Sequence, residues 1–313
     1  MNNQKVELLS PAGNLEKLKI AIKYGADAVY AGVSHFSLRI RAGKEFTFET
    51  FKEGIDYAHA RGKKVYATIN GFPFNSQIEL LKKHIATMAA LKPDGFIVAA
   101  PGVVKLCREI APEIDIHLST QANVLNYLDA QVFWDMGVKR IVVAREISLK
   151  DVVEIKKHLP DMEIEIFVHG SMCFAYSGRC LVSAVQMGRV PNRGSCANDC
   201  RFEYTLYAAN EDHSTLFRLE EEPGVGTYIF NSKDMNLASH IKEILDSGAV
   251  DSLKIEGRTK SPYYAAVTAK AYREAIDDYY AGKFEADKYQ KELYTTKNRG
   301  FTDAYLIHRP FEK

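Results

Sequence analysis

The strongest constraint on the fold is a unit that recurs along the first half of the chain: a short apolar strand, a loop and an amphipathic helix. The predicted strands are rich in Val, Ile and Ala, and most are followed by a segment with helical periodicity. Strands that alternate with helices in this way build a parallel sheet with right-handed crossovers. The pattern therefore predicts an α/β protein.

Seven predicted strands precede or enter a cysteine-rich loop, and an eighth follows after an interruption. The strands are predicted at 7–10, 28–31, 64–69, 95–99, 115–118, 140–143, 163–168 and 251–255. Helices are predicted at 14–24, 47–60, 77–91, 103–110, 128–136, 149–158 and 261–280. Ser261 is placed as the N-cap of the last helix, with Pro262 at the favoured first helical position.

Eight such strands predict a (β/α)₈ TIM-type barrel, with a doubly wound open sheet as the alternative. No GxGxxG motif follows the first strand, which argues against a dinucleotide-binding Rossmann domain. The barrel is expected to span residues 1–282, including the cysteine-rich loop 170–200 and a β-rich insertion 202–232 between strands seven and eight. Within the insertion, strands are predicted at 204–208 and 227–230 around an acidic tip at 220–222. Residues 283–313 are expected to form a C-terminal extension.

Composition narrows the classes of function. Apolar residues make up 46% of the chain and charged residues 26%, as in globular proteins with a sizeable core. The formal net charge of +1 gives no overall basic field for a nucleic acid, although a local basic patch is compatible with it. The N-terminus lacks the pattern of a secretory signal, and no apolar run is long enough to span a membrane. We therefore expect a cytoplasmic protein with reduced thiols and no membrane partner.

Four of the five cysteines lie in the segment 165–200, with six, fifteen and three residues between them: Cys173, Cys180, Cys196 and Cys200. Four crowded thiols suggest a disulfide pair, zinc, an iron–sulfur cluster or a nucleophile. Zinc sites commonly pair their ligands two to four residues apart, a spacing that only Cys196 and Cys200 meet. Iron–sulfur clusters tolerate irregular spacing, so the pattern favours a cluster over zinc. Cys107 lies in an apolar helix and is interpreted as a core residue.

Polar residues cluster where the predicted strands end, which is the functional face of a TIM barrel. The candidate substrate-binding residues are Gln121, Arg145, Lys254 and Arg258, and the candidate catalytic residues are Glu146, His169 and Glu256. Three cations around one mouth would suit a ligand that carries carboxylates or phosphates. The two glutamates are either acid–base groups or ion-pair partners. The histidine is a neighbour of the metal site, a proton donor or a core residue.

The segment 165–183 fits, position for position, the signature of the collagenase-like peptidase U-32 family. The matching residues are Glu165, Phe167, Gly170, Ser171, Met172, Cys173, Gly178, Cys180, Val182 and Ser183. The segments ELLSPAG, STQANV, VAREISL and LKIEGR are also similar to family segments. The resemblance thus covers nearly the whole chain.

The resemblance implies a [4Fe–4S] cluster held by the four loop cysteines, because relatives that hydroxylate RNA or quinone precursors without oxygen carry one there. The branch it resembles most is the one that converts tRNA wobble uridine to 5-hydroxyuridine with prephenate as hydroxyl source. On this interpretation tRNA is a partner, and prephenate or a similar dicarboxylate binds the barrel-mouth cations. Zinc is the alternative metal.

Two other functions stay open. The family name implies a peptidase, although no catalytic dyad is identifiable and neither GxSxG nor HExxH occurs. A metal-stapled, non-catalytic partner of a longer paralogous U-32 protein is the third interpretation. Relatives of the tRNA type continue beyond the segment 298–302 into a small β-rich domain, whereas this sequence stops at Lys313. It is therefore expected to work with a paralogue or to bind RNA through another surface.

Overall fold

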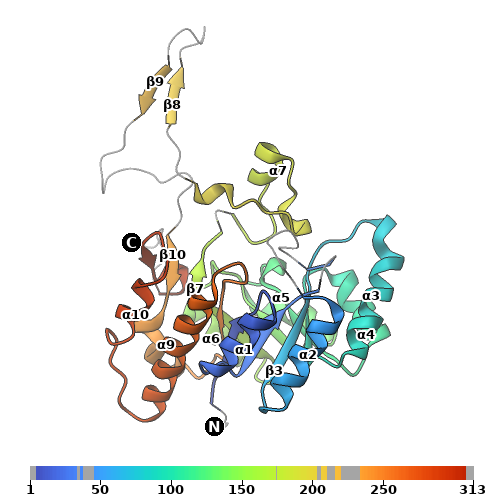
Figure 1. Cartoon of the computed structure of the whole chain (residues 1–313), viewed down its shortest axis with the longest axis horizontal. Helices are drawn as coiled ribbons and strands as arrows, with labels where there is room; N and C mark the ends of the chain where they lie inside the picture. The colour runs from blue at the N-terminus through green and yellow to red at the C-terminus, as the bar shows by residue number, and fades with distance from the viewer. Residues whose placement is uncertain are drawn as a thin grey trace.

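Eight parallel strands form a closed barrel in the computed structural model (Figure 1). In order around the barrel they are β1 (Glu7–Pro11), β2 (Ala28–Ala31), β3 (Lys64–Ile69), β4 (Gly95–Val98), β5 (Asp115–Leu118), β6 (Arg140–Val142), β7 (Glu163–Ser171) and β11 (Ser252–Ile255). Strand β11 pairs with β7 on one side and with β1 on the other, which closes the sheet. The predicted TIM-type barrel is confirmed and the open-sheet alternative is wrong.

The structure describes residues 5–33, 36–37, 46–173, 175–202, 206–209, 216–219 and 233–307. The helices are α1 (Leu15–Lys23), α2 (Phe48–His59), α3 (Ile78–Ala90), α4 (Pro101–Ile110), α5 (Tyr127–Asp135), α6 (Leu149–His158), α7 (Val182–Met187), α8 (Ile241–Asp246), α9 (Pro262–Tyr280), α10 (Gln290–Tyr294) and α11 (Ala304–Ile307). Within these ranges, no helix combines the length and the apolar character needed to cross a bilayer.

Side-chain caps start several of the outer helices. Asn14 accepts a hydrogen bond from the Lys17 amide at the start of α1, and Ser148 caps α6 in the same way. The predicted N-cap of α9 is confirmed, because the Ser261 side chain accepts from the Tyr264 amide and a proline follows it. Such caps satisfy amide groups that have no partner within the helix.

The barrel interior is partly ionic. The Arg140 guanidinium, which is buried, forms salt bridges with Glu7 (2.5 Å), Glu163 (2.6 Å) and Glu165 (3.1 Å). Burial by itself raises the pKa of Glu7, but the nearby Arg140 charge and hydrogen bonds outweigh it and the net pKa is lowered. Three carboxylates from two strands, β1 and β7, are thus tied to one cation.

Strand β7 is longer than the predicted strand 163–168. Its last residues pair antiparallel with β10 (Asp234–Asn236), and His169 lies opposite Asn236. The short strand β12 (Phe301–Thr302) then pairs parallel to β10. The polar residues that the sequence places beyond the end of strand seven therefore belong to the strand itself.

The cysteine-rich loop follows β7 and carries α7 above the barrel (Figure 1). Beyond it, β8 (Leu206–Ala209) and β9 (Leu216–Leu219) pair antiparallel, so the structure contains a β-hairpin in the predicted β-rich insertion. Strand β8 overlaps the strand predicted at 204–208. The strand predicted at 227–230 and the acidic tip at 220–222 lie outside the described residues.

Candidate functional site

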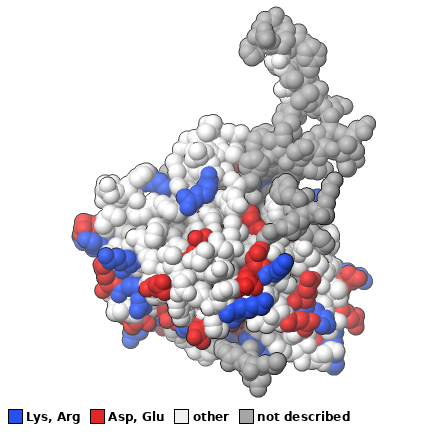
Figure 2. Space-filling view, turned by 180° about the vertical axis from the view of Figure 1, so that it is seen from behind, with Lys and Arg blue, Asp and Glu red and all other residues white. Residues whose placement is uncertain are grey.

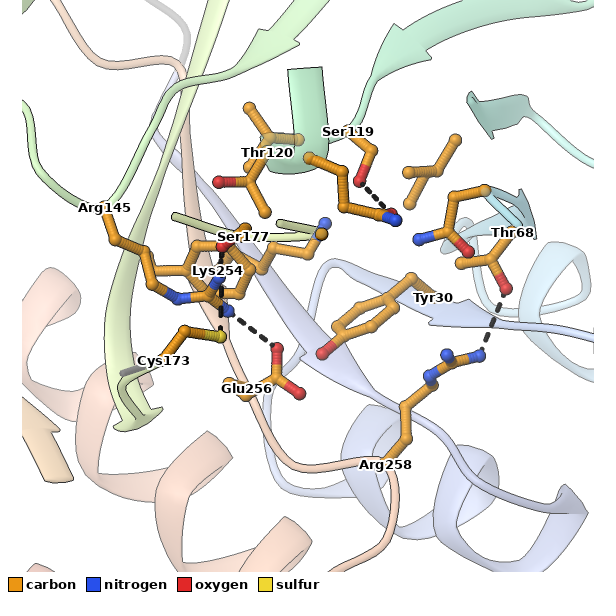
Figure 3. A pocket seen from close by; sticks show the side chains of 16 residues that line it. Tyr30, Thr68, Ser119, Thr120, Arg145, Cys173, Ser177, Lys254, Glu256 and Arg258 are labelled. Atoms are coloured by element: carbon orange, nitrogen blue, oxygen red, sulfur yellow. Dashed lines mark hydrogen bonds and ion pairs between the residues drawn. The ribbon is translucent and has the colours of Figure 1, made fainter. Parts of the chain in front are cut away.

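A cavity of about 110 Å³ lies at the C-terminal ends of the barrel strands (Figure 3). Strand ends and the cysteine loop line it together: Tyr30, Thr68, Asn70, Ile97, Ser119, Thr120, Gln121, Val142, Arg145, Phe167, Cys173, Ser177, Gly178, Lys254, Glu256 and Arg258. All four candidate substrate-binding residues are among them, and so is Glu256. The volume is below the few hundred Å³ typical of small-molecule sites, so a ligand would occupy it with one end.

Lys254 points from β11 into this cavity, but its charge is already paired. Its Nζ lies 2.6 Å from Glu165 Oε1 and 4.4 Å from the centroid of the Tyr30 ring. Lys254 and Glu165 are both buried, and Glu165 also accepts from Arg140. Lys254 therefore belongs both to the ionic network of the barrel and to the cavity lining.

Arg145 connects the barrel to the cysteine loop. Its Nη2 lies 3.2 Å from Glu256 Oε2, and its Nη1 donates to Ser177 Oγ at 2.5 Å. The guanidinium also lies 4.0 Å from the centroid of the Phe167 ring. Glu256 is thus an ion-pair partner of Arg145, and Arg145 holds the loop against the strand ends.

Arg258 lies on the opposite side of the cavity from Arg145 (Figure 3). Its Nη1 donates to Ser37 Oγ at 2.7 Å and to Thr68 Oγ1 at 3.1 Å. These two hydroxyls, one from the segment after β2 and one from β3, hold the guanidinium in place. Three cationic side chains therefore reach one cavity, as the sequence predicts, although two of them are also bonded to carboxylates.

The Gln121 side chain brings a buried hydrogen-bond donor to the cavity wall. It is 2% exposed and its Oε1 accepts from Ser119 Oγ at 3.1 Å. Its Nε2 has no hydrogen-bond partner among the described residues. A buried amide donor without a partner is costly, so an acceptor atom of a ligand or a water molecule would be stabilised there.

Two candidate catalytic residues lie outside the cavity lining. Glu146 is half-buried, its Oε2 has no hydrogen-bond partner within the described chain, and burial raises its pKa. His169 is 1% exposed and packs against the rings of Tyr264, Tyr272 and Phe301. Burial lowers the pKa of His169 to about 3, so it is neutral at pH 7. The structure favours the core-histidine interpretation over the proton donor.

The four loop cysteines are partly exposed free thiols, and Cys200 lies close enough to the other three for their charges to affect it. Burial is the main reason that the pKa of Cys200 is raised, and the charges of the other three cysteines raise it further. The Asn198 amide donates to Cys196 Sγ at 3.4 Å, and Ser177 Oγ lies 4.0 Å from Cys173 Sγ. The fifth cysteine, Cys107, is fully buried in α4, as predicted.

This donor set fits an iron–sulfur cluster. Thiolates are the ligands of such clusters, and hydrogen bonds to their sulfur atoms help to set the redox potential. Within the ranges that the structure describes, no three His, Cys, Asp or Glu side chains form a ready site for a single metal ion. A four-iron cluster binds each thiolate to a different iron, so its ligands do not have to converge on a single ion.

Sequence reasoning missed three residues that shape the cavity: Tyr30, Glu165 as the partner of Lys254, and Ser177 as the partner of Arg145. Tyr30 had a signal, because it is the one large side chain in a four-residue strand of Ala and Val. The sequence gives no signal for the pairings of Glu165 and Ser177, because their partners lie 89 and 32 residues away in the chain.

The fold and the cavity define a TIM-type barrel protein with a cavity at its strand ends that is partly lined by a four-cysteine loop. A family model described as "Peptidase family U32" matches residues 13–313. The chain belongs to this family.

Named relatives cover nearly the whole chain. A "tRNA hydroxylation protein P" from Helicobacter pylori J99 is 71% identical over 309 residues, which are 99% of this chain and 73% of the relative. The Escherichia coli K12 protein of the same name is 42% identical, over 96% of this chain and 74% of the relative. A solved structure described as a U32 peptidase is 15% identical, with a TM-score of 0.53 over 82% of this chain and 96% of that one. At that identity it supports the fold alone.

Proposed function

We propose that the chain is a tRNA hydroxylation enzyme that converts wobble uridine to 5-hydroxyuridine without oxygen. The observation that carries the proposal is that Cys173 of the cysteine loop and Gln121 line the same cavity. The Gln121 amide has no hydrogen-bond partner among the described residues, so it is available to a ligand. The names of the two relatives, which refer to tRNA hydroxylation, support the RNA substrate. The cavity thus adjoins the thiols that are proposed to bind the metal cluster.

The hydroxyl donor is proposed to be prephenate or a similar dicarboxylate. Arg145, Lys254 and Arg258 line the cavity, and the Gln121 amide provides a further donor. Charge-assisted hydrogen bonds of this kind hold carboxylates in a fixed orientation. Because the cavity is small, one carboxylate end would enter it and the rest of the donor would face the cysteine loop.

Cys173, Cys180, Cys196 and Cys200 are the proposed holders of a [4Fe–4S] cluster. When bound, such a cluster supplies redox-active, Lewis-acidic iron next to the cavity. The chain's own groups orient the donor: Arg145 holds the loop through Ser177, and Gln121 offers its amide to the ligand.

The test is the hydroxylated nucleoside itself. Mass spectrometry of tRNA nucleosides should show loss of 5-hydroxyuridine derivatives in a strain that lacks the gene and every paralogue. Return of the modification with the wild-type gene, but not with a Cys173→Ala gene, is the expected result. Unchanged nucleosides in the deletion strain would overturn the proposal.

The peptidase interpretation receives no geometric support from the described residues. His169, the histidine nearest in sequence to the loop cysteines, is neutral and packed among aromatic rings. It therefore offers no base for a thiol nucleophile. Proteolysis that survived substitution of all four loop cysteines would revive this function.

A further inference from the structure

The tight turn at residues 176–179 forms part of the cavity rim. The Arg179 amide donates to the Tyr176 carbonyl at 3.0 Å, which closes the turn. The two central residues, Ser177 and Gly178, line the cavity. Gly178 has a φ of +79°, and a Cβ there would lie 3.2 Å from the Gln121 side chain, so the turn fits closely against the cavity wall.

The two outer residues of the same turn face solvent. Tyr176 is 47% exposed, and Arg179 is exposed as well. The two central residues of the turn line the cavity, so the turn holds the Tyr176 ring and the Arg179 guanidinium next to it on the protein surface.

The surface of the cysteine loop continues this combination of apolar and basic groups. Leu181, Val185, Met187 and Phe202 are exposed, which is unusual for large apolar side chains so close together. In Figure 1 the helix α7, which carries two of them, stands above the barrel. In Figure 2 the upper part of the described surface is mostly white with blue residues, and the red residues gather lower down.

The loop surface is also positively charged, although the chain as a whole is nearly neutral. Residues 172–202 include four arginines and a single acidic residue, Asp199. Asp199 is 1% exposed and accepts a hydrogen bond from Ser183, so it adds no negative charge to the surface. A basic surface without exposed carboxylates attracts a polyanion.

We propose that the turn at residues 176–179, together with the surrounding surface of the cysteine loop, binds an unpaired RNA loop. In this rim, a base stacks on Tyr176 and Arg179 holds its phosphate. The inference rests on the proposed tRNA function and extends it to the binding surface. Unpaired RNA loops are recognised through bases that stack on aromatic side chains, with arginines on the backbone. A nucleotide that follows the stacked base would then reach the cavity. Exposed apolar and arginine side chains also occur at protein interfaces, but the lack of surface acid favours RNA.

The experiment measures binding of the metal-loaded protein to fluorescein-labelled RNA by anisotropy under anaerobic conditions. One probe is a short hairpin with an unpaired, uridine-containing loop, and the other is a fully paired duplex with the same number of phosphates. The wild-type protein should prefer the hairpin. Tyr176→Ala should weaken hairpin binding by about fivefold to a hundredfold, the effect of one stacked base, and Tyr176→Phe should not. Arg179→Ala should lower the slope of log K against log salt by about 0.7, and Arg179→Lys should retain it.

Tyr24→Ala and Arg61→Ala are the matched controls. Both residues are exposed and lie in connections from a helix to the next strand, at the opposite end of the barrel. They should leave hairpin binding unchanged. Iron content and visible absorbance are measured for each variant, because Arg179 adjoins Cys180, and the Lys variant separates loss of charge from damage to the loop.

Wild-type-like hairpin binding by both Tyr176→Ala and Arg179→Ala would overturn the inference, as would equal affinity of the wild type for hairpin and duplex. Loss of a co-purifying protein in these variants, with RNA affinity intact, would assign the surface to a protein partner instead. Hydroxylation is assayed separately on the same samples. If hairpin binding depends on Tyr176 and Arg179 but no 5-hydroxyuridine forms, the proposed function is overturned and the RNA-binding surface stands. If 5-hydroxyuridine forms but hairpin binding does not depend on these residues, the proposed function stands and the RNA-binding surface is overturned.

Discussion

The Lys254 ammonium lies 2.6 Å from the Glu165 carboxylate, in a buried salt bridge that joins β11 to β7. These are the two strands between which the cysteine loop and the hairpin are inserted. Glu165 is also the first residue of the family signature, and its structural role is to hold one buried cation and help to hold another, Arg140. The ion pair therefore lies both at the closure of the barrel and beneath the cavity.

Removal of Glu165 should destabilise the barrel, because it leaves the buried Lys254 ammonium without a carboxylate. We expect Glu165→Ala to lower the free energy of unfolding by about 3–5 kcal/mol, measured by urea denaturation. The matched control is Glu79→Ala, which breaks an exposed salt bridge with Lys82 and should cost about 0–1 kcal/mol. Equal losses in the two variants would contradict the role of the buried pair.

Gln121 should contribute to binding of the carboxylate donor, because its buried amide has no partner within the described chain. Gln121→Ala should raise the KM for the donor by about tenfold to a hundredfold, since a hydrogen bond to a charged group contributes about 1.5–3 kcal/mol. Gln121→Glu should raise it further by repulsion. Gln131→Ala, which removes an exposed glutamine on α5, is the control. An unchanged KM in both Gln121 variants would exclude this residue from the donor site.

The cluster ligands should be separable from the core cysteine. Cys173→Ala and Cys200→Ala should each lose iron and the absorbance near 400 nm of protein purified without air, a property of such clusters. Cys107→Ala should retain both, because that thiol is buried in α4. A colourless, zinc-loaded wild-type protein under the same conditions would count against the cluster and for the zinc alternative.

His169 should make the fold sensitive to acid. Its pKa is lowered by burial to about 3, with Lys260 lowering it further and Asp234 opposing the shift. Its pKa in the unfolded chain is about 6.5. As pH falls from about 6.5 towards 3, the unfolded chain gains a proton that the folded chain does not, so stability should fall by up to about 1.4 kcal/mol per pH unit. His169→Gln should remove that part of the slope in urea titrations between pH 7 and pH 5, whereas His158→Asn, on the exposed end of α6, should not.

Much of the architecture could be predicted because its signals are local. Strand length, β-branched content, helical periodicity and the cap at Ser261 depend on residues close together in the chain. These signals place all eight barrel strands within a few residues of their observed positions. The grouping of Gln121, Arg145, Lys254 and Arg258 also followed, because strand ends of a closed parallel barrel meet at one face.

The partners of those side chains could not be predicted, because they depend on segments that meet only after folding. Lys254 was expected to be a ligand cation and does line the cavity, and closure of β11 against β7 also places it beside Glu165. His169 was a candidate catalytic residue, but pairing of β7 with β10 extends the strand and buries the ring among aromatic side chains. Local sequence identifies which chemical groups reach the barrel mouth; long-range strand pairing determines which of them are neutralised, buried or left open to a ligand.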